Sequence, residues 1–393
     1  MNKQILNKEV QDYIKKHVND DVHRIAMAKS PFRDVEAKDL ANQIAARNKA
    51  AKKLPSWYKQ DFIYYPALLS IEQCSSETTA AYKAGLARGN RLIDLTGGFG
   101  VDSLYFAKRI EQVTHCEINA SLSEIAAHNA SILQQKNMRF LAVDGIAFLK
   151  ESNEYFDTIY IDPARRSDTG KVFMLKDCSP NVVEHLDLML DKADRILIKT
   201  APLLDLTAGL KELKNVSEIH IVSVKNECKE LIWIIEKEPA AHLKIVAVTL
   251  NQSVKQFSFF KDEVEEEVHF IQGMPVGYLY EPDTALLKSG AFNRIASRYN
   301  LEKLDHNTQL YTSPVTIAEF PGRIFKINRI ISTGDLKKEK NLIGNVIVRS
   351  YPDKAETLVK KYKIKADNLK FLIFTQVKNM GNLVIEAEIV QHY

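Results

Sequence analysis

Cysteine is scarce in this chain, with four residues among 393. The four thiols are far apart and no two of them form a Cys-x-x-Cys pair. Such scattering is typical of a reduced protein. No apolar run approaches the roughly 18 residues of a membrane-spanning helix, and no apolar leader opens the sequence. We therefore expect a cytoplasmic protein that has no membrane anchor and no metal site.

A strong excess of one charge is also missing. The net charge is +4, which by itself is too small to indicate a nucleic-acid binder. The distribution is less even, because residues 336–378 hold eleven basic residues against four acidic ones, whereas residues 262–267 form an acidic run. By length alone, the chain should form two or three domains.

The first part of the chain has two different patterns. Residues 1–88 have apolar residues at helical spacing, interrupted by prolines, which predicts a helical N-terminal region. From residue 91 to 236 strands and helices alternate, as in a mostly parallel sheet with helices on both faces. We expect seven strands, near 91–95, 112–117, 138–143, 156–161, 194–200, 217–224 and 230–236. The last two are joined by too short a turn for a parallel crossover, so they must pair antiparallel.

Beyond Pro239 the pattern becomes α+β. We expect strands near 242–250, 266–271, 323–331, 343–349, 369–377 and 382–390, with helices near 284–299 and 353–363. The predicted organisation is a helical region at 1–88, an α/β domain with a Rossmann-like sheet at 89–238, an α+β domain at 239–332 and a basic domain at 333–393.

The stretch most informative about function is residues 91–102, which read RLIDLTGGFGVD. A short apolar strand runs into a turn containing Gly97, Gly98 and Gly100, and a helix-like segment follows. Glycine has no Cβ, so the backbone can turn sharply and approach a ligand closely. This outline predicts a nucleotide-binding loop, to which Thr96 also belongs.

The charges beside this loop indicate which nucleotide it binds. Asp94 and Asp102 stand before and after the glycines, where they would repel a pyrophosphate. A dinucleotide fingerprint would also need a third glycine where Ser103 stands. The sequence therefore favours a cationic ligand, and S-adenosylmethionine (SAM) fits, with a sulfonium, an ammonium and no phosphate. A glycine-rich turn without a ligand is the alternative.

Acidic residues also end the next two expected strands, at the edge of the sheet where ligands of open α/β folds bind. Glu117 ends the second strand, where a carboxylate can accept both ribose hydroxyls. Asp144 ends the third, where it can accept the adenine amino proton. We include the neighbouring Asn119 and Gly145 in the predicted cofactor site. Each acid alone could merely cap a helix.

The fourth strand ends in Asp162-Pro163-Ala164-Arg165-Arg166. Proline forces Asp162 into an extended backbone, so its oxygens would project beside a methyl donor. Asp162 could accept a proton or a hydrogen bond from an attacking nitrogen, and the two arginines could grip a phosphate or stack on a base. Alternatively, Asp162 caps a loop and the arginines are solvated or pair with nearby acids.

These motifs resemble motifs one to four of the class I SAM-dependent methyltransferases, over roughly residues 88–238. Together with segments 72–77, 280–283 and 288–290 and the basic tail, they are similar to a bacterial family with a ferredoxin-like insert and a C-terminal THUMP-like domain. The resemblance implies SAM as cofactor, RNA as the substrate class, a ferredoxin-like domain at 239–332 and a THUMP-like domain at 333–393. It also implies that residues 283–290 close over the active site.

The chain departs from better-understood relatives at the substrate side. Base-amino methyltransferases usually carry Asp/Asn-Pro-Pro and an aromatic residue, where this chain has Ala164 and Arg165. Carbon methyltransferases of uridine need a cysteine nucleophile, for which Cys178 and Cys228 are the candidates. Neither has the expected neighbourhood, and buried inert thiols are the simpler interpretation. The methylated atom therefore stays open.

The basic tail could hold RNA through its phosphates, or could serve only solubility. Its candidate contacts are Lys337, Lys338, Lys340, Arg349, Lys360, Lys361, Lys363 and Lys365, with Tyr351, Tyr362 and Phe371 nearby. The leading hypothesis is a SAM-dependent methyltransferase acting on rRNA or tRNA. The alternatives are a methyltransferase for a small molecule or protein, and a non-catalytic SAM- and RNA-binding module. The oligomeric state cannot be inferred from the sequence.

Overall fold

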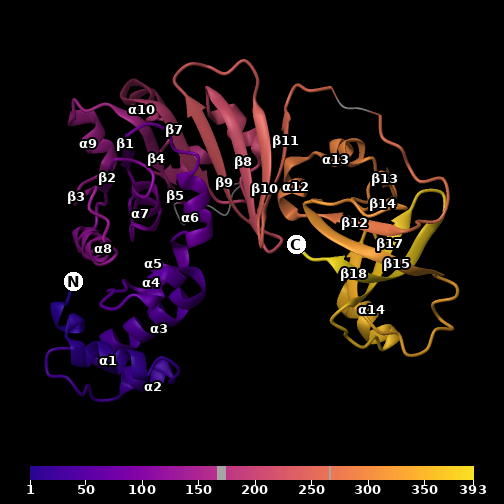
Figure 1. The fold of residues 1–393 in the computed structure, drawn as a ribbon, viewed down its shortest axis with the longest axis horizontal. Coiled ribbons are helices and arrows are strands. Elements are labelled where there is room, and N and C mark those ends of the chain that lie inside the picture. Colours follow the sequence, from indigo (N-terminus) through magenta and orange to yellow (C-terminus); the bar gives the residue numbers. More distant parts are fainter. Residues whose placement is uncertain (166–173, 265–266) are drawn as a thin grey trace. The chain divides into compact units, whose positions relative to one another are not determined.

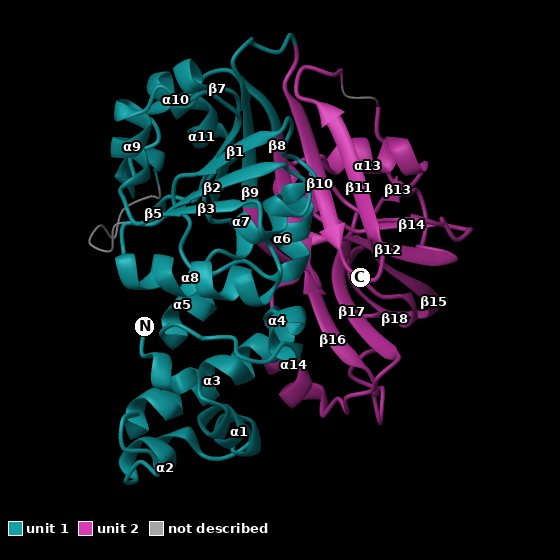
Figure 2. Cartoon of the chain, turned by 60° about the vertical axis from the view of Figure 1, so that its left-hand side comes forward, with its two compact units in different colours: residues 1–218, 231–241 teal, residues 219–230, 242–393 magenta. Residues whose placement is uncertain are grey.

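The computed structural model describes residues 1–165, 174–264 and 267–393 (Figure 1). They form two compact units (Figure 2). Unit 1 comprises residues 1–218 and 231–241, and unit 2 comprises residues 219–230 and 242–393. Among the described residues, no helix is both long and apolar enough to cross a membrane.

Helices make up the first part of unit 1, as the sequence predicts. They are a 3₁₀ turn (Lys3–Leu6), α1 (Lys8–Lys16), α2 (Val22–Met27), α3 (Ala37–Lys53), α4 (Pro55–Lys59), α5 (Leu68–Gln73) and α6 (Glu77–Ala84). α3 ends at Lys53, and Leu54 is its C-cap. Pro55 begins α4 at the first helical position, where a backbone N–H would have no partner within the helix, so proline costs no hydrogen bond there. Ser76 caps α6, because its hydroxyl accepts the Thr79 N–H at 3.2 Å.

The parallel sheet of unit 1 follows the expected strands closely. Its strands are β1 (Arg91–Asp94), β2 (Gln112–Cys116), β3 (Met138–Leu141), β4 (Phe156–Ile161), β7 (Ala193–Thr200) and β9 (Glu227–Glu236). They are hydrogen-bonded in the order β3-β2-β1-β4-β7-β9. Pairing is parallel from β3 to β7 and antiparallel between β7 and β9. A Rossmann-like sheet with an antiparallel last strand is therefore confirmed.

The antiparallel strand arises from a tight hairpin. β8 (Val216–Val224) neighbours β9 and is joined to it by Lys225 and Asn226. Both turn residues have positive φ, 51° and 60°, as the twist of a two-residue hairpin requires. The hairpin contributes residues to both units.

Helices cover the sheet of unit 1 and make its core. They are α7 (Val101–Ala107), α8 (Ala120–Ile132), α9 (Gly145–Glu151), α10 (Leu186–Lys192) and α11 (Leu206–Glu212). The central strands are buried along nearly their whole length, as parallel strands covered on both faces must be. Leu92, Tyr160, Leu197 and Ile234 pack in one cluster with Phe106 of α7. This packing fixes the carboxyl ends of the strands, from which the loops of the site emerge.

Unit 2 is α+β. Its strands beyond the hairpin are β10 (Lys244–Leu250), β11 (Val254–Phe260), β12 (Tyr278–Pro282), β13 (Glu302–Lys303), β14 (Tyr311–Ser313), β15 (Gly322–Ser332), β16 (Asn345–Arg349), β17 (Lys370–Val377) and β18 (Gly381–Gln391). Its helices are α12 (Thr284–Ser289), α13 (Phe292–Tyr299) and α14 (Ala355–Tyr362). β10 neighbours β8 and pairs antiparallel with β11, and the other strands form a sheet of order β13-β14-β12-β15-β18-β17-β16.

Several details of unit 2 differ from the expectations. The helix expected near 284–299 is two helices, because Gly290 takes a left-handed conformation with φ of 73°. The strand expected near 266–271 is wrong within its described residues, where Phe270 makes only an isolated bridge to Lys303. Strands β11 to β14 were missed. The domain boundary near residue 332 stays a prediction.

Candidate functional site

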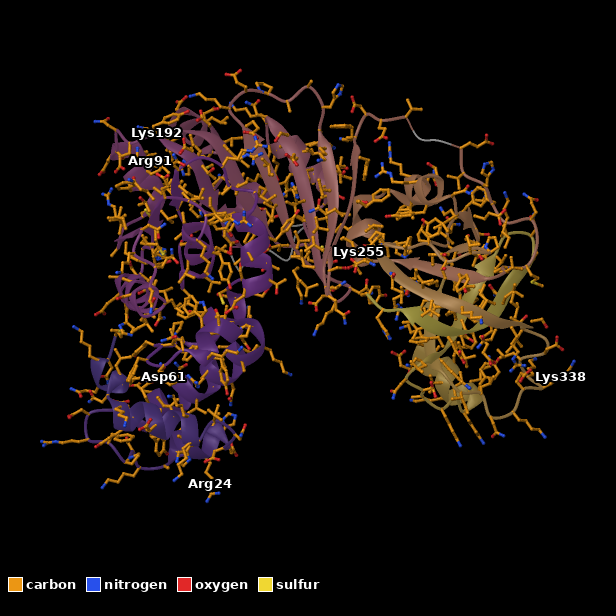
Figure 3. The ribbon with its side chains drawn as sticks, in the orientation of Figure 1. Arg24, Asp61, Arg91, Lys192, Lys255 and Lys338 are labelled. Atoms are coloured by element: carbon orange, nitrogen blue, oxygen red, sulfur yellow. The ribbon has the colours of Figure 1, made fainter. Side chains whose placement is uncertain are left out.

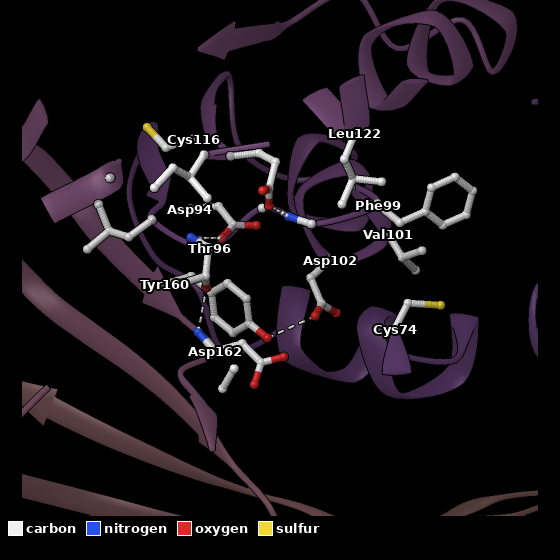
Figure 4. A pocket seen from close by; sticks show the side chains of 18 of the residues that line it. Cys74, Asp94, Thr96, Phe99, Val101, Asp102, Cys116, Leu122, Tyr160 and Asp162 are labelled. Atoms are coloured by element: carbon white, nitrogen blue, oxygen red, sulfur yellow. Dashed lines mark hydrogen bonds between the residues drawn. The ribbon is translucent and has the colours of Figure 1, made fainter. Parts of the chain in front are cut away.

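A cavity of about 410 Å³ opens at the carboxyl ends of β1, β2 and β4 in unit 1 (Figure 4). Five acidic residues and no basic residue line it within the described part of the chain. The lining residues are Ser70, Gln73, Cys74, Ser75, Asp94, Leu95, Thr96, Gly97, Gly98, Phe99, Gly100, Val101, Asp102, Cys116, Glu117, Ile118, Leu122, Asp144, Gly145, Tyr160, Asp162, Ala164, Ser179 and Pro180. Except for Asn119, every predicted cofactor residue lies in this lining.

Asp94 ends β1 at the bottom of the cavity and is only 1% exposed. One carboxylate oxygen accepts the Thr96 N–H at 3.0 Å, and the other accepts the Ser103 hydroxyl. Burial raises the pKa of Asp94 to about 7, and the charges of Asp102 and Asp162 act in the same direction, while both hydrogen bonds oppose the shift. Because both oxygens already have protein donors, Asp94 would act on a ligand mainly through its charge.

The glycine turn folds over a buried histidine. A Cβ at Gly97 would lie 1.9 Å from Nδ1 of His115, whose side chain on β2 is fully buried. Gly98 and Gly100 have φ of 56° and 84°, values that only glycine adopts readily. Burial lowers the pKa of His115 to about 4, so its ring is neutral at pH 7. The predicted need for glycine in this loop therefore has a specific steric cause at Gly97.

Glu117 follows β2 and is held in place by two backbone donors. Its Oε2 accepts the Gly98 N–H at 2.9 Å, and its Oε1 accepts the Asn119 N–H at 2.7 Å. Asn119 caps α8 through its side chain and lies outside the cavity lining. The next residue, Ile118, is 73% exposed and lines the cavity, so an apolar surface adjoins the fixed carboxylate.

Asp144 has the capping role that the sequence left open as an alternative. Its Oδ1 accepts the N–H groups of Ile146 and Ala147 at the start of α9, at 2.8 and 3.0 Å. The side chain is exposed and lines the cavity. A Cβ on Gly145 would come within 2.4 Å of the Leu95 carbonyl, so glycine is needed for α9 to approach β1. Binding of adenine by Asp144 stays a prediction.

Asp102, in the first turn of α7, belongs to a buried network that the sequence did not reveal. Its Oδ2 accepts the hydroxyls of Ser75 and Tyr160, each at 2.8 Å, and its Oδ1 lies 3.2 Å from Nζ of Lys83 (Figure 4). The Lys83 side chain is fully buried and also donates to Ser75 at 2.9 Å. Burial alone would raise the pKa of Asp102, but Lys83, Lys199 and the two hydroxyls outweigh it and lower the pKa. Asp102 is thus an anion anchored to α6.

Asp162 follows β4 directly and also lines the cavity. Its N–H donates to the Thr96 hydroxyl at 2.7 Å, which ties this loop to the glycine turn (Figure 4). Its carboxylate forms an ion pair with Lys199 of β7, and its side chain is 34% exposed. The sequence did not predict this partner for Asp162. The pairing keeps one Asp162 oxygen directed toward β7.

The segment after Asp162 forms a short ribbon. Pro163 is buried, and β5 (Ala164–Arg165) pairs antiparallel with β6 (Cys178–Ser179), which follows a 3₁₀ turn (Leu175–Asp177). Ala164, Ser179 and Pro180 of this ribbon line the cavity. The Arg165 backbone is described in β5, whereas Arg166 lies outside the described residues. Phosphate or base binding by either arginine stays a prediction.

The cysteines that line the cavity are not the two that the sequence offered as candidates. Cys74 and Cys116 line the cavity, whereas Cys178 is buried in β6 and Cys228 lies in unit 2. Burial raises the pKa of Cys74 to about 11 and that of Cys228 also to about 11, so neither is a thiolate at pH 7. The sequence offered Cys178 and Cys228 as candidates, and not Cys74, which directly follows α5.

The basic residues predicted to hold RNA lie in unit 2 with mixed surroundings. Lys337 and Lys340 are exposed, and the exposed Lys338 projects from the surface beside its partner Asp335 (Figure 3). Arg349, in contrast, forms a 2.6 Å ion pair with the buried Glu281, and Phe371 is a core residue. The predicted contacts are therefore not one continuous free surface.

Residues of segment 280–283 form ion pairs and hydrogen bonds within unit 2. Glu281 is 2% exposed and pairs with Arg323 as well as Arg349. Asp283 caps α12 and accepts the Ser223 hydroxyl, both within unit 2. These contacts explain the residue types by packing, and closure of 283–290 over the cavity stays a prediction.

Comparison with known proteins gives a full-length relative. The chain matches the crystal structure of a candidate methyltransferase from Porphyromonas gingivalis W83 with a TM-score of 0.87 and 30% identity, over 99% of each chain. The chain belongs to the family of class I SAM-dependent methyltransferases. Its sheet order and the acidic cavity at the strand ends are those expected of that family.

Two further matches concern parts of this methyltransferase. A family model described as a ferredoxin-like domain matches residues 278–321, within the segment for which the sequence implied such a domain. An uncharacterized RNA methyltransferase of Mycoplasma mobile is 40% identical over 75 residues, 19% of this chain. The chain spans about a fifth of the length of that curated relative, since the match covers 21% of it.

Proposed function

We propose that the chain transfers a methyl group from SAM to a nucleotide of rRNA or tRNA. The observation that carries the cofactor assignment is the lining of the cavity by five carboxylates and no basic side chain among the described residues. RNA as substrate is supported by the name of the Mycoplasma mobile relative. The basic residues of unit 2 would add affinity for phosphates.

The residues of the cavity fit SAM. Its volume of about 410 Å³ is within the usual range for a cofactor site. Glu117 is held by two N–H groups, and each of its oxygens retains a lone pair for a ribose hydroxyl. The exposed Ile118 offers an apolar face for adenine, and the glycine turn lets the backbone approach the amino-acid part of the ligand. A pyrophosphate would instead meet five carboxylates and, among the described residues, no basic side chain.

SAM supplies an already activated methyl group on a positively charged sulfur, so the protein's task is to position the nucleophile. Asp162, fixed by Thr96 and Lys199, would accept a hydrogen bond or a proton from an attacking nitrogen. The Tyr160 hydroxyl donates to the Asp102 carboxylate and holds it in place.

SAM affinity should depend on pH through Asp94. Its pKa is raised to about 7, so the carboxylate is largely protonated at pH 6 and largely ionised at pH 8. Because the ionised form attracts a cation, we expect SAM affinity to rise from pH 6 to pH 8, by up to about tenfold. Titration calorimetry across this range measures the effect.

The isosteric Asp94→Asn variant provides the control for this pH dependence. It should bind SAM weakly and nearly independently of pH, while Glu117→Gln should retain the wild-type slope. A slope that survives in Asp94→Asn would assign the titration to another group.

Loss of the Glu117 carboxylate should weaken SAM binding directly. Glu117→Ala removes the acceptor for the ribose and also leaves the Gly98 N–H without its partner. We expect a loss of about 1–3 kcal/mol in SAM binding, as for a charge-assisted hydrogen bond. Calorimetry at pH 8 checks this value. The matched control is Glu184→Ala, an exposed acid outside the cavity lining, which should leave the affinity unchanged.

RNA methylation is tested with RNA from a strain that lacks the gene. Wild-type protein and tritiated SAM should label this RNA, and mass spectrometry of ribosomal and transfer RNA then identifies the nucleotide. Asp162→Ala should bind SAM but label the RNA at least a hundredfold more slowly. Labelling of small metabolites or protein instead would favour the first alternative substrate class. Unchanged RNA modification in an Asp162→Ala strain would favour a non-catalytic module.

A further inference from the structure

The N-terminal helices carry more net positive charge than the whole chain. Residues 1–60 contain 13 Lys and Arg against seven Asp and Glu, a charge of +6, whereas the full chain has +4. Arg24 shows the exposure of this region, since its side chain points outward from α2 (Figure 3). These helices belong to unit 1, the unit that contains the cavity.

A stripe of lysines on α3 faces the helix that lines the cavity. Lys49, Lys52 and Lys53 are spaced three and four residues apart, so they share one face of α3. Lys53 donates to the carbonyls of Ile71 and Glu72 at the end of α5, at 2.9 and 2.6 Å. Lys49 pairs with the Glu72 carboxylate at 3.2 Å. The stripe is therefore held against α5.

α5 connects this stripe to the cavity. Its residues Ser70 and Gln73 line the cavity, together with Cys74 directly after it. Leu69, next to Ser70, is 60% exposed and offers an apolar surface to a ligand. Figure 1 shows α3, α4 and α5 together below α7 and α8. Only α5 thus separates the lysines of α3 from the interior of the cavity.

Two cations in this region have no acidic partner. Lys52 is exposed on the stripe, and Lys59 is exposed at the end of α4, which packs against α3. Within the described ranges, neither side chain forms an ion pair. We name Lys49, Lys52, Lys53 and Lys59 the basic shoulder. Of the neighbouring carboxylates, Glu72 pairs with Lys49 at 3.2 Å, and Asp61 pairs with Lys15 at 2.6 Å.

We infer that the basic shoulder binds the phosphates of the RNA strand that delivers its nucleotide to the cavity. This inference rests on the proposed function and names the surface that holds its substrate. The five lining carboxylates repel a polyanion, so a strand can present a base there only if cations lie beside the cavity. The shoulder supplies them on the α5 side, in the same unit as the cavity.

The test uses the full-length protein and two probes. A fluorescein-labelled 20-nucleotide single-stranded RNA reports affinity by anisotropy, and RNA from the deletion strain reports methyl transfer. Lys52→Glu with Lys59→Glu should weaken binding of the 20-mer about tenfold at low salt. The slope of log affinity against log salt should fall by about 0.7 for each lost phosphate contact. KM for the RNA should rise while kcat and SAM affinity stay unchanged.

Three further variants make the result specific. Lys211→Glu introduces the same charge change as either shoulder substitution alone, near the end of α11, which connects β7 to β8. It should bind the RNA as the wild type does. Lys337→Glu with Lys340→Glu tests the basic tail of unit 2. Lys52→Ala with Lys59→Ala, with an unchanged melting temperature, separates lost contacts from any misfolding.

The outcomes distinguish the surface from the function. If the wild type methylates RNA and the Lys52/Lys59 variants keep its affinity, salt slope and KM, the shoulder is not the docking surface and the proposed function stands. If only the Lys337/Lys340 variant loses binding, RNA is held by unit 2 and the inference is overturned. If the wild type neither binds nor methylates RNA, both the inference and the proposed function fail.

Discussion

Gly97→Ala is expected to lower the free energy of unfolding by about 3 kcal/mol, the upper end of the cost of overpacking a core. The added Cβ would lie 1.9 Å from Nδ1 and 2.0 Å from Cε1 of His115. His115 cannot move aside easily, because it is fully buried and packs on Phe140 with ring centroids 5.0 Å apart. Urea unfolding monitored by fluorescence measures the loss, and calorimetry should show that SAM binding is lost as well.

Two comparisons separate this clash from a general sensitivity of the loop. Gly98→Ala meets no atom closer than 3.8 Å, but its φ of 56° should cost about 1 kcal/mol. Gly97→Ala combined with His115→Ala removes the clash, so the double variant should be at least about 1 kcal/mol more stable than the sum of the single losses predicts. Additive losses would show that His115 is not the cause.

Lys83→Met is expected to lower the free energy of unfolding by about 3–5 kcal/mol at pH 7, because it leaves a buried carboxylate without its cation. Lys83 is fully buried and lies 3.2 Å from Asp102. Methionine preserves the apolar length of the side chain, so the loss reports the charge. Urea unfolding at several pH values is the measurement.

The pH dependence of this loss has a definite sign. In the wild type the pKa of Asp102 is lowered, so its ion pair stabilises the fold above the unfolded pKa near 3.8 and ceases to do so as pH falls through the lowered value. In Lys83→Met, burial should instead raise that pKa, and the penalty should shrink as acid protonates Asp102. The difference between the two proteins should therefore be largest near neutral pH.

The controls for Lys83→Met are another ion pair and a compensating change. Lys214 pairs with Asp187 on the surface, with side chains 55% and 76% exposed, so Lys214→Met should change stability little. Lys83→Met with Asp102→Asn removes both charges and should recover part of the loss. If the double variant is no more stable than Lys83→Met, packing rather than charge explains the effect.

Much of unit 1 could be predicted because its signals are local. The expected strand at 156–161 agrees with β4 at both ends, since a buried parallel strand is a mostly apolar run between polar loops. The hairpin of β8 and β9 followed from a turn too short for a crossover. Unit 2 was harder, because short strands such as β13 and β14 have only two and three residues and depend on their neighbours for hydrogen bonds.

The sequence revealed the acidic residues of the candidate site but not their lysine partners, for a similar reason. Asp94, Glu117 and Asp162 follow strands, and this position can be read from local pattern alone. Lys199 pairs with Asp162, and Lys83 pairs with Asp102 in the same lining, yet Lys83 stands in an ordinary helix and Lys199 in an ordinary strand. Nothing near either lysine in sequence distinguishes it from a surface lysine.

By itself, the sequence determined the order of strands and helices, the glycine turn and the acids at the strand ends, because each depends on residues close together in the chain. The tertiary structure alone decided which charges meet. It buried Lys83 against Asp102, directed Lys199 to Asp162 and placed His115 beneath Gly97. These contacts join residues 18 to 37 positions apart, and only the packing of helices on a twisted sheet fixes such distances.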